Sequence, residues 1–364
     1  MRLGINATFL SDRPAGVDLF TREVSCQLCR INKETTLFAS KNIGSCNTLK
    51  TPKGIRGSIC LVNNVSRFIY INTVLPLLIK RHRLDVLYCP MVEFPFVPVK
   101  ARLVVTIHDL HPLYFPEQFG LSSDHFKWAL RILPLLARRV TVPSNFVRHE
   151  LLRICPSLRP DQIDVVYNGY DRQRFYPRIA DMKRPILSSY NIRPPYILFV
   201  GSLFEYKNLK ALVKAYLEVK DVIPHCLVVV GKQEVAKGPL TEDDRILYLD
   251  YVKAEDLPYL YSYADVFVHP ALFEGFGLAV IEAMACGVPV LSSNGGSLPE
   301  VCGDGALLFE PHDSDQLKAL LLEVIGNEEL RRDMKKRGLE NIRRFSWEKT
   351  AQGIMSSCEL ALQV

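Results

Sequence analysis

The sequence predicts an α/β protein with two Rossmann-like domains that face each other across a cleft. The chain has 364 residues, enough for two domains of ordinary size, each with its own core. Short apolar, β-branched runs alternate with amphipathic segments along its whole length, the pattern of parallel sheets covered by helices. The stretch from Tyr263 to Gly305 alone reads as a complete βαβ unit.

The first domain is expected to contain strands and helices in alternation. The expected strands cover residues 2–6, 35–39, 59–62, 85–89, 102–107, 140–142 and 163–166, and the expected helices 17–29, 68–80, 126–139 and 146–155. Residues 40–57 are rich in Lys, Asn, Gly and Ser and predict a mobile loop. The first strand is followed by Gly16 but by no Gly-x-Gly-x-x-Gly, which argues against a dinucleotide-dependent dehydrogenase.

A segment with little periodicity, residues 171–195, is the best candidate for a linker, and the predicted boundary lies near Pro194. The domains are therefore expected at 1–194 and 195–345, followed by a final helix at 346–364. The second domain is expected to have strands at 196–200, 226–230, 246–249, 266–268, 288–291 and 306–309, and helices at 209–220, 255–262, 278–286, 313–325 and 328–344.

Two carboxylates, Glu274 and Glu282, flank a glycine-containing turn in the βαβ unit. Gly275 and Gly277 permit positive φ angles and the close approach of another molecule. The free N–H groups of residues 276–279 and the positive end of the following helix form an anion site suited to a phosphate. Glu282, just over one turn into the helix, can accept both hydrogens of a ribose diol, and Glu274 can reach hydroxyls carried by the diphosphate. The alternative is a solvated loop Glu and a helix-capping Glu.

The spacing Glu274-x7-Glu282, with Gly275-Phe276-Gly277 and the run from residue 282 to 290, closely resembles the signature of family 4 retaining glycosyltransferases. These enzymes use nucleotide sugars and have the two-domain GT-B fold. The resemblance is strong over residues 196–311 and diffuse over residues 1–195. It implies that Glu274 holds donor-sugar hydroxyls, that Glu282 binds the nucleotide ribose, and that the final helix crosses back to the first domain.

Lys207 begins a helix after the loop at Gly201 and Ser202, where its charge opposes the helix dipole, so an anionic partner is expected; simple exposure to solvent is the alternative. The family resemblance implies that Lys207 neutralises the donor diphosphate. Many members add an Arg in this loop, where the chain has Ser202 and Tyr206, so part of the expected positive charge is absent or supplied from elsewhere.

His108 follows an expected strand at the end where open sheets bind ligands, although a purely structural His is the alternative. The resemblance implies that His108 contacts the donor sugar, that Gly16 lies near the donor phosphate, and that the backbone near Val252 lies beside the base. The predicted catalytic residues are His108, Lys207 and Glu274. The predicted donor-binding residues are Gly16, Ser202, Lys207, Val252, Glu274, Gly275, Phe276, Gly277, Leu278 and Glu282.

Composition restricts the remaining possibilities. No run of 18 apolar residues is present, and the first residues begin a strand rather than a signal peptide, so a cytoplasmic protein with reduced cysteines is expected. Cys26 and Cys29 form the only close pair of cysteines, without a second pair at zinc-site spacing. Asp313-Ser314-Asp315 is interpreted as a helix cap rather than a metal motif.

Charge is unevenly distributed along the chain. Residues 1–180 contain 25 Lys and Arg against 13 Asp and Glu, whereas residues 181–364 contain 20 against 26. The basic half is expected to meet an anionic partner, either a membrane surface, which would place the protein peripherally on its inner face, or a phosphorylated acceptor. Nucleic acid is the competing partner, but the sequence has no nucleic-acid-binding motif and the charges are dispersed.

These observations predict a retaining glycosyltransferase that moves a sugar from a nucleoside diphosphate to a hydroxyl of a glycan or lipid-linked acceptor. Loop similarity to mannosyl- and rhamnosyltransferases of surface polysaccharides makes GDP-mannose the first choice of donor. No metal or other cofactor is expected, because Lys207 and the helix N-terminus supply positive charge. The alternatives are a sugar phosphorylase or nucleotide-sugar epimerase with the same two halves, and a non-catalytic nucleotide-sugar binding protein.

Overall fold

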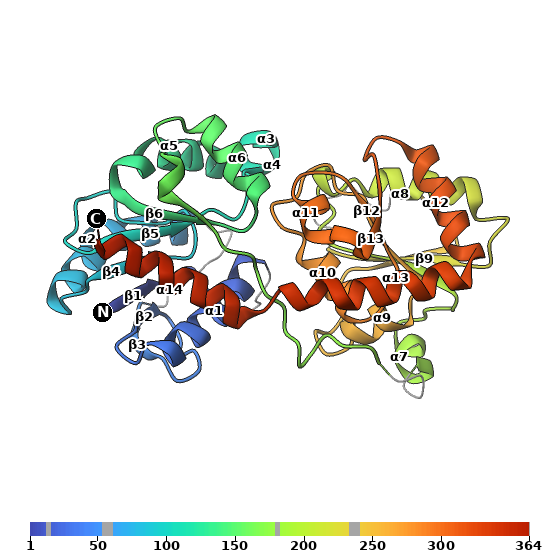
Figure 1. Cartoon of the computed structure of the whole chain (residues 1–364), viewed down its shortest axis with the longest axis horizontal. Helices are drawn as coiled ribbons and strands as arrows, with labels where there is room; N and C mark the ends of the chain where they lie inside the picture. The colour runs from blue at the N-terminus through green and yellow to red at the C-terminus, as the bar shows by residue number, and fades with distance from the viewer. Residues whose placement is uncertain (12–15, 53–60, 179–182, 233–240, 364) are drawn as a thin grey trace. The chain divides into compact units, whose positions relative to one another are not determined.

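The computed structural model describes residues 1–11, 16–52, 61–178, 183–232 and 241–363. The chain forms two compact units, Met1–Gly169 together with Trp347–Val364, and Tyr170–Ser346 (Figure 1). Each unit contains a parallel sheet with helices packed on it, and the predicted class of two Rossmann-like α/β units is confirmed. Within the described part of the chain, every helix is too short or too polar to cross a membrane.

The N-terminal unit is built on a parallel sheet with the strand order β3-β2-β1-β4-β5-β6-β7. Its strands are β1 (Leu3–Asn6), β2 (Thr36–Ala39), β3 (Asn47–Lys50), β4 (Val86–Cys89), β5 (Arg102–Thr106), β6 (Ala137–Val142) and β7 (Ile163–Val165). Its helices are α1 (Val17–Ile31), α2 (Leu61–Arg81), α3 (His111–Tyr114), α4 (Pro116–Phe119), α5 (Leu121–Leu136), α6 (Asn145–Ile154) and α14 (Trp347–Gln363). The central strands β1 and β4 are buried along their whole length, which explains their continuous apolar runs.

Three predictions for this unit are wrong. Leu61 and Val62, expected in a strand, begin helix α2, and the rest of that expected strand lies outside the described residues. Strand β3 lies inside the expected loop at 40–57; it is a partly exposed edge strand of mostly polar residues, so it lacks an apolar pattern. The strand residues Ala137–Arg139 were expected to be helical, but Ala137 and Arg139 pair with Leu103 and Val104 of β5.

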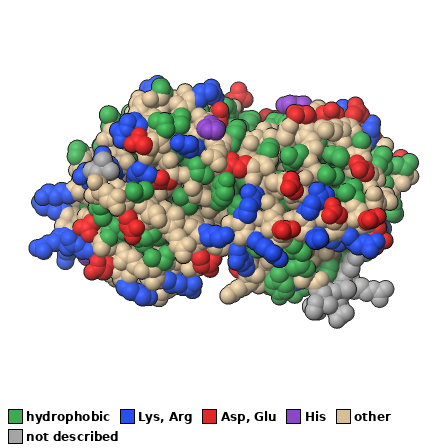
Figure 2. Space-filling model, viewed as in Figure 1, with side chains coloured by type: hydrophobic (Ala, Val, Ile, Leu, Met, Phe, Trp, Pro, Cys, Tyr) green, Lys and Arg blue, Asp and Glu red, His purple; other side chains and the backbone are tan. Residues whose placement is uncertain are grey.

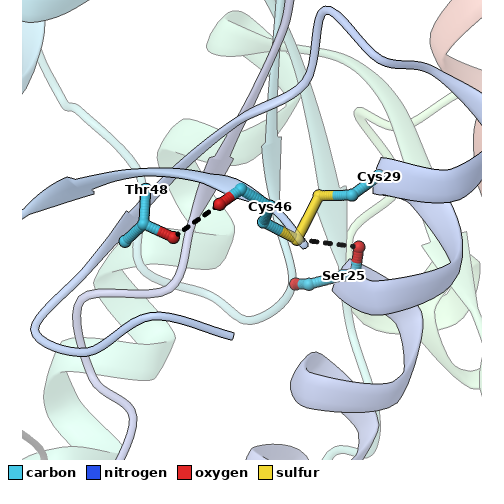
Figure 3. Close-up of a disulfide and its surroundings, with 4 residues drawn as sticks. All are labelled: Ser25, Cys29, Cys46 and Thr48. Atoms are coloured by element: carbon cyan, nitrogen blue, oxygen red, sulfur yellow. Dashed lines mark hydrogen bonds between the residues drawn. A yellow bond between two sulfur atoms is a disulfide. The ribbon is translucent and has the colours of Figure 1, made fainter. Parts of the chain in front are cut away.

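A disulfide joins Cys29 of α1 to Cys46, just before β3, so the expectation of reduced cysteines is wrong for this pair (Figure 3). The Cα atoms lie 5.4 Å apart although the residues are 17 positions apart in the sequence. Spacing could not predict the bond, because the position of the edge strand beside α1 brings the two residues together. The Thr48 hydroxyl donates a 3.2 Å hydrogen bond to the Cys46 carbonyl on the same segment.

The C-terminal unit is built on a parallel sheet with the order β10-β9-β8-β11-β12-β13. Its strands are β8 (Tyr196–Val200), β9 (Cys226–Val230), β10 (Ile246–Leu249), β11 (Val266–His269), β12 (Val290–Ser293) and β13 (Ala306–Phe309). Its helices are α7 (Lys183–Ser189), α8 (Leu209–Val219), α9 (Leu257–Tyr263), α10 (Leu278–Ala285), α11 (Leu298–Cys302), α12 (Ser314–Gly326) and α13 (Glu328–Asn341). The strand order reverses between β8 and β11, the place where open sheets of this kind bind ligands at the carboxyl ends of the strands.

The C-terminal unit begins at Tyr170, well before the boundary expected near Pro194. The reason is that the expected linker binds this unit directly: the Arg174 guanidinium donates to the Ala254 carbonyl, and the Arg178 N–H donates to the Ser262 hydroxyl at 3.1 Å. Residues without helical or strand periodicity can still belong to a domain through such contacts.

The last helix, α14, belongs to the N-terminal unit and packs along α1 (Figure 1). At its start, the Trp347 ring packs against Phe20 of α1 with 5.9 Å between centroids.

Candidate active site

Lys207 and Glu274 meet at the reversal point of the C-terminal sheet. Lys207 lies in the turn Glu205–Lys207 after β8, and Glu274 lies in the loop after β11. Because β8 and β11 are parallel neighbours, the segments that follow them emerge at the same edge of the sheet. Lys207 Nζ lies 2.7 Å from Glu274 Oε2, and both side chains are largely buried. The structure thus brings together two residues that the sequence singled out separately.

The two loops are tied to each other by backbone hydrogen bonds. The Leu272 N–H donates to the Tyr206 carbonyl at 2.7 Å, which joins the loop after β11 to the loop after β8. Asn208 has a left-handed backbone (φ 54°), a conformation that Asn tolerates better than most residues. Its side-chain amide donates to the carbonyls of Pro270 and Pro311 at 3.1 and 2.7 Å. These bonds fix the backbone from which Lys207 projects.

The charge of Glu274 is stabilised by its neighbours. Burial alone would raise the pKa of Glu274, but the Lys207 ammonium and His269 outweigh burial and hold the pKa well below its usual range. Burial lowers the pKa of His269, whose Nε2 lies 3.7 Å from Glu274 Oε2. At neutral pH the site therefore contains an ionised carboxylate, an ammonium and a neutral imidazole, and the sequence analysis did not identify His269.

Residues 295–297, which follow β12, pack against the backbone of the Glu274 loop. A Cβ on Gly296 would lie 2.4 Å from the Glu274 carbonyl oxygen, and one on Gly295 would lie 2.5 Å from the Ala271 carbonyl oxygen, so only glycine fits at either position. The Ser297 N–H and hydroxyl both donate to the Glu274 carbonyl at 3.0 Å. The sequence analysis missed these residues; the adjacent glycines directly after a strand were the available signal.

Helix α10 begins at Leu278, after Gly277, and is followed by Gly287. Gly277 and Gly287 have φ angles of 96° and 72°, a conformation that favours glycine. Gly275 would also permit a positive φ but does not adopt one. Phe276 is buried against the Phe345 ring with 5.5 Å between centroids. This packing fixes the start of the helix, where first-turn N–H groups have no partner within the helix itself.

Glu282 lies half-buried on α10, near Tyr261 of α9 and the Arg174 side chain. Burial raises the pKa of Glu282 to about 7, because Arg174 and Tyr261 offset the cost of burying the charge only in part. Glu282 therefore gives up its proton less readily than an exposed glutamate does. The two glutamates of the motif thus differ sharply: Glu274 is ionised by its Lys partner, whereas Glu282 is poised to ionise.

Two further donor-site candidates, Ser202 and Val252, lie at the same edge of the C-terminal sheet. Ser202 is half-buried in the loop after β8, and Val252 is buried in the segment after β10. A Cβ on Gly231, just after β9, would lie 2.0 Å from the Gly201 carbonyl oxygen, so these loops touch. Lys232 follows Gly231 and brings a cation to this edge, at a position that the sequence analysis did not consider.

His108 and Gly16 belong to the N-terminal unit. Burial lowers the pKa of His108, with partial compensation from the Pro90 carbonyl, which lies 2.7 Å from Nε2. A carbonyl can only accept, so Nε2 carries the proton of the neutral ring and Nδ1 is an acceptor. Gly16 precedes α1 with φ 52°. Phe20 of α1 packs edge-on against the His108 ring with 4.5 Å between centroids.

A pocket of about 620 Å³ opens beside His108 in the N-terminal unit. Its walls come from α2, α5 and the segment after β4, and they are largely apolar and aromatic. The pocket also contains a largely buried ion pair, in which Arg67 Nη2 lies 2.8 Å from Glu93 Oε1. The pocket can enclose an apolar group while offering charged and polar partners at Arg67, Glu93 and Asp109.

Asp313 has the capping role expected of it. Its carboxylate accepts a 2.8 Å hydrogen bond from the Gln316 N–H at the start of α12, and Asp315 pairs with Lys318 at 2.7 Å. Across the described ranges, the structure contains no cluster of three or more His, Cys, Asp and Glu side chains suited to a metal ion.

Comparison with known proteins gives the family. Residues 14–174 match the model of "Glycosyltransferase Family 4", and residues 186–341 match that of "Glycosyl transferases group 1". An O-antigen chain mannosyltransferase B from Escherichia coli is 34% identical over 262 residues, which cover 68% of this chain and 67% of the relative. The chain belongs to glycosyltransferase family 4.

Other relatives of this glycosyltransferase include α-maltose-1-phosphate synthase of Mycobacterium tuberculosis, which is 29% identical over 61% of this chain and 62% of its own. The serotype-specific mannosyltransferase WbdA of Escherichia coli is 30% identical over 71% of this chain but 34% of its own longer chain.

Solved structures share the fold of the whole chain. Sucrose-phosphate synthase from Thermosynechococcus elongatus superimposes with a TM-score of 0.75 at 20% identity, covering 97% of each chain. WaaG, a glycosyltransferase involved in lipopolysaccharide biosynthesis, gives 0.74 at 14% identity, covering 98% of this chain and 99% of its own. The glycosyltransferase therefore has the GT-B fold.

Proposed function

We propose that this glycosyltransferase moves mannose from GDP-mannose to a hydroxyl of a glycan or lipid-linked acceptor, with retention of anomeric configuration, in the synthesis of a surface polysaccharide. The observation that carries the proposal is the buried Lys207–Glu274 pair at the sheet reversal, in a chain 34% identical to an O-antigen mannosyltransferase.

In the proposed reaction, Lys207 and the N–H groups at the start of α10 stabilise the negative charge of the departing diphosphate. Glu274 is ionised by its Lys partner and accepts hydrogen bonds from hydroxyls of the donor sugar. Glu282 binds the ribose diol as a carboxylate, which requires the loss of the proton that burial favours in the unliganded protein. Lys232 supplies part of the positive charge that an Arg in the loop at Ser202 provides in many relatives.

The chemical step needs no protein nucleophile. The acceptor oxygen forms a bond to the anomeric carbon on the face from which the diphosphate leaves, and a phosphate oxygen takes the acceptor proton. His108 in its neutral form offers Nδ1 as an acceptor to a donor-sugar hydroxyl. The pocket beside His108 receives the acceptor, and its apolar walls suit a lipid-linked glycan.

The test is a donor screen followed by a turnover measurement. A ligand present at 100 times its Kd stabilises a protein by about 2.7 kcal/mol, so thermal unfolding with GDP, UDP and ADP, each with and without an attached sugar, ranks the donors. GDP-mannose should stabilise most. UDP-glucose belongs in the screen because a structural neighbour was solved with it.

Turnover then separates transfer from the alternatives. GDP should be released only when an acceptor is present, and NMR of the product should show the anomeric configuration of the donor. Sugar 1-phosphate formed with inorganic phosphate would identify a phosphorylase, and binding without turnover in the presence of acceptor glycans would identify a binding protein.

A further inference from the structure

Helix α2 exposes a line of large apolar side chains. Val65, Ile69 and Leu77 share one face of the helix because they are spaced by four and eight residues. Ile69 is 54% exposed and Leu77 is 67% exposed. Thr73 lies between them, and its hydroxyl bonds back to the Ile69 carbonyl at 2.7 Å, so this position adds little polarity. The outward face of α2 is thus apolar over three turns.

Helix α5 has a similar outward face. Leu121, Trp128 and Leu135 are spaced by seven residues and therefore lie along one side of the helix. Leu121 is 74% exposed, Leu135 is 82% exposed, and the Trp128 ring also reaches solvent. Isolated exposed apolar residues are common on proteins, but two rows on adjacent helices form a continuous patch.

The two rows lie next to each other. Phe96 packs between the helices, with ring centroids 5.7 Å from Phe68 of α2 and 4.4 Å from Trp128 of α5. Val65, Phe68 and Leu121 also line the pocket beside His108. The exposed apolar surface therefore continues from the mouth of this pocket along both helices. We call the outward faces of α2 and α5 the apolar surface.

Basic residues accompany the apolar surface. Lys80 and Arg81 are exposed at the end of α2, followed by exposed Arg83, and Arg131 is exposed on α5 between Trp128 and Leu135. Lys and Arg side chains project from the unit drawn on the left in Figure 2. Arg139 is not part of this set, because its guanidinium pairs with the Asp164 carboxylate and is largely buried.

We propose that the apolar surface docks this protein onto a bilayer that contains anionic phospholipid. Aliphatic and Trp side chains enter the boundary between headgroups and acyl chains, and the flanking Lys and Arg residues meet the phosphates, the arrangement of helices that lie in the membrane interface. The charge complementarity favours a lipid surface over a second copy of the chain, because a copy would bring the same positive charges together.

Docking in this manner does not depend on the reaction that the protein catalyses. One consequence does rest on the proposed function: the mouth of the pocket beside His108 would open at the membrane surface, where a lipid-linked acceptor is found. This consequence explains why the pocket walls and the apolar surface are continuous.

Vesicle flotation tests the proposal. The full-length protein should float with phosphatidylcholine vesicles containing 30% phosphatidylglycerol, bind pure phosphatidylcholine weakly, and be released as NaCl rises, because exposed charges are screened. The variant Ile69→Ser/Leu77→Ser/Leu135→Ser should lower vesicle affinity at least about tenfold, since binding scales with buried apolar area. All three side chains are exposed and lie outside the pocket lining, so the fold should be retained.

Matched controls come from exposed residues elsewhere. Val222→Ser/Leu322→Ser removes apolar side chains from the C-terminal unit and should leave flotation unchanged. Lys80→Gln/Arg81→Gln/Arg131→Gln should weaken binding to acidic vesicles, whereas Lys210→Gln/Lys214→Gln, on the exposed side of α8, should not.

Two results would overturn the proposal. One is the absence of binding to acidic vesicles at low salt; the other is equal flotation of the Ile69→Ser/Leu77→Ser/Leu135→Ser variant and its control. A dimer in light scattering that this variant converts to a monomer would reassign the apolar surface to contacts between copies. Stabilisation by GDP, measured in parallel, reports on the donor site separately, so failure of the proposed function remains distinguishable from failure of docking.

Discussion

Glu282→Gln should weaken nucleotide binding and at the same time stabilise the unliganded protein. The pKa of Glu282 is raised from 4.5 to about 7 because the ionised form is buried without a full partner. Each pKa unit corresponds to 1.36 kcal/mol, so the ionised carboxylate destabilises the folded state by about 3 kcal/mol above neutral pH. Gln has nearly the same shape and carries no charge, so the variant avoids this cost.

The pH dependence gives the sign of the effect. The folded state binds the Glu282 proton more tightly than the unfolded chain does, so the destabilisation is absent below pH 4.5, grows between pH 4.5 and 7, and is complete above pH 7. Wild type and variant should therefore have similar stability at pH 4.5, and the variant should be about 3 kcal/mol more stable at pH 8. Glu323→Gln, which changes an exposed carboxylate on α12, is the control.

Nucleotide binding should favour the ionised form of Glu282, whereas folding favours the protonated form. An ionised Glu282 accepts both ribose hydroxyls, so the affinity of the wild type for GDP should rise about tenfold per pH unit below 7 and level off above it, as for any ligand that needs a proton to leave. Glu282→Gln should lose about 1–3 kcal/mol of binding free energy at pH 8 and this pH dependence.

Urea unfolding at several pH values and calorimetric titration with GDP measure the two effects. Equal stability of wild type and variant at pH 8 would show that the charge of Glu282 is compensated in the folded protein. Unchanged GDP affinity in Glu282→Gln would remove the residue from the nucleotide site.

Three further outcomes are expected. Lys207→Ala should lower kcat by about 10²–10³-fold, because the charge of the leaving diphosphate loses its stabilising cation. It should also destabilise the protein by about 3 kcal/mol, because Glu274 is left buried without a partner. Lys210→Ala is the control, and unchanged steady-state kinetics of Lys207→Ala would contradict the catalytic role of Lys207. Activity should survive EDTA, because protein groups carry the positive charge; loss that Mn²⁺ restores would refute metal independence. Cys46→Ser should lower the free energy of unfolding of the oxidised protein by about 3 kcal/mol, since the bond to Cys29 closes a 17-residue loop. Dithiothreitol should abolish this difference between wild type and variant. Urea titrations with and without reductant measure it.

Several features follow from the sequence by itself. Continuous apolar runs such as 196–200 and 226–230 predict their strands almost to the residue, because strands buried on both faces have little choice of side chain. The turn from Glu274 to Gly277 and the helix that follows it were predicted from neighbouring residues, although Ser297 and Phe345 also hold them in place. Local chemistry of this kind also carries the resemblance to the family.

Other features depend on contacts that no local pattern records. The edge strand β3 exists because it pairs with β2, and the Arg139 end of β6 exists because it pairs with β5 and Asp164, against its helical propensity. The early start of the C-terminal unit depends on contacts made by Arg174 with a segment 80 residues away.

The electrostatic character of the candidate site was likewise decided only by the tertiary structure. Sequence identified Lys207, Glu274 and Glu282 as candidates. It did not show that Lys207 and Glu274 form a pair, or that burial raises the pKa of Glu282. Parallel pairing of β8 with β11 brings Lys207 and Glu274 within 2.7 Å, and packing of α10 against α9 buries Glu282. Motifs specify which groups are available; burial and distance, which set their charges, arise when segments remote in sequence pack together.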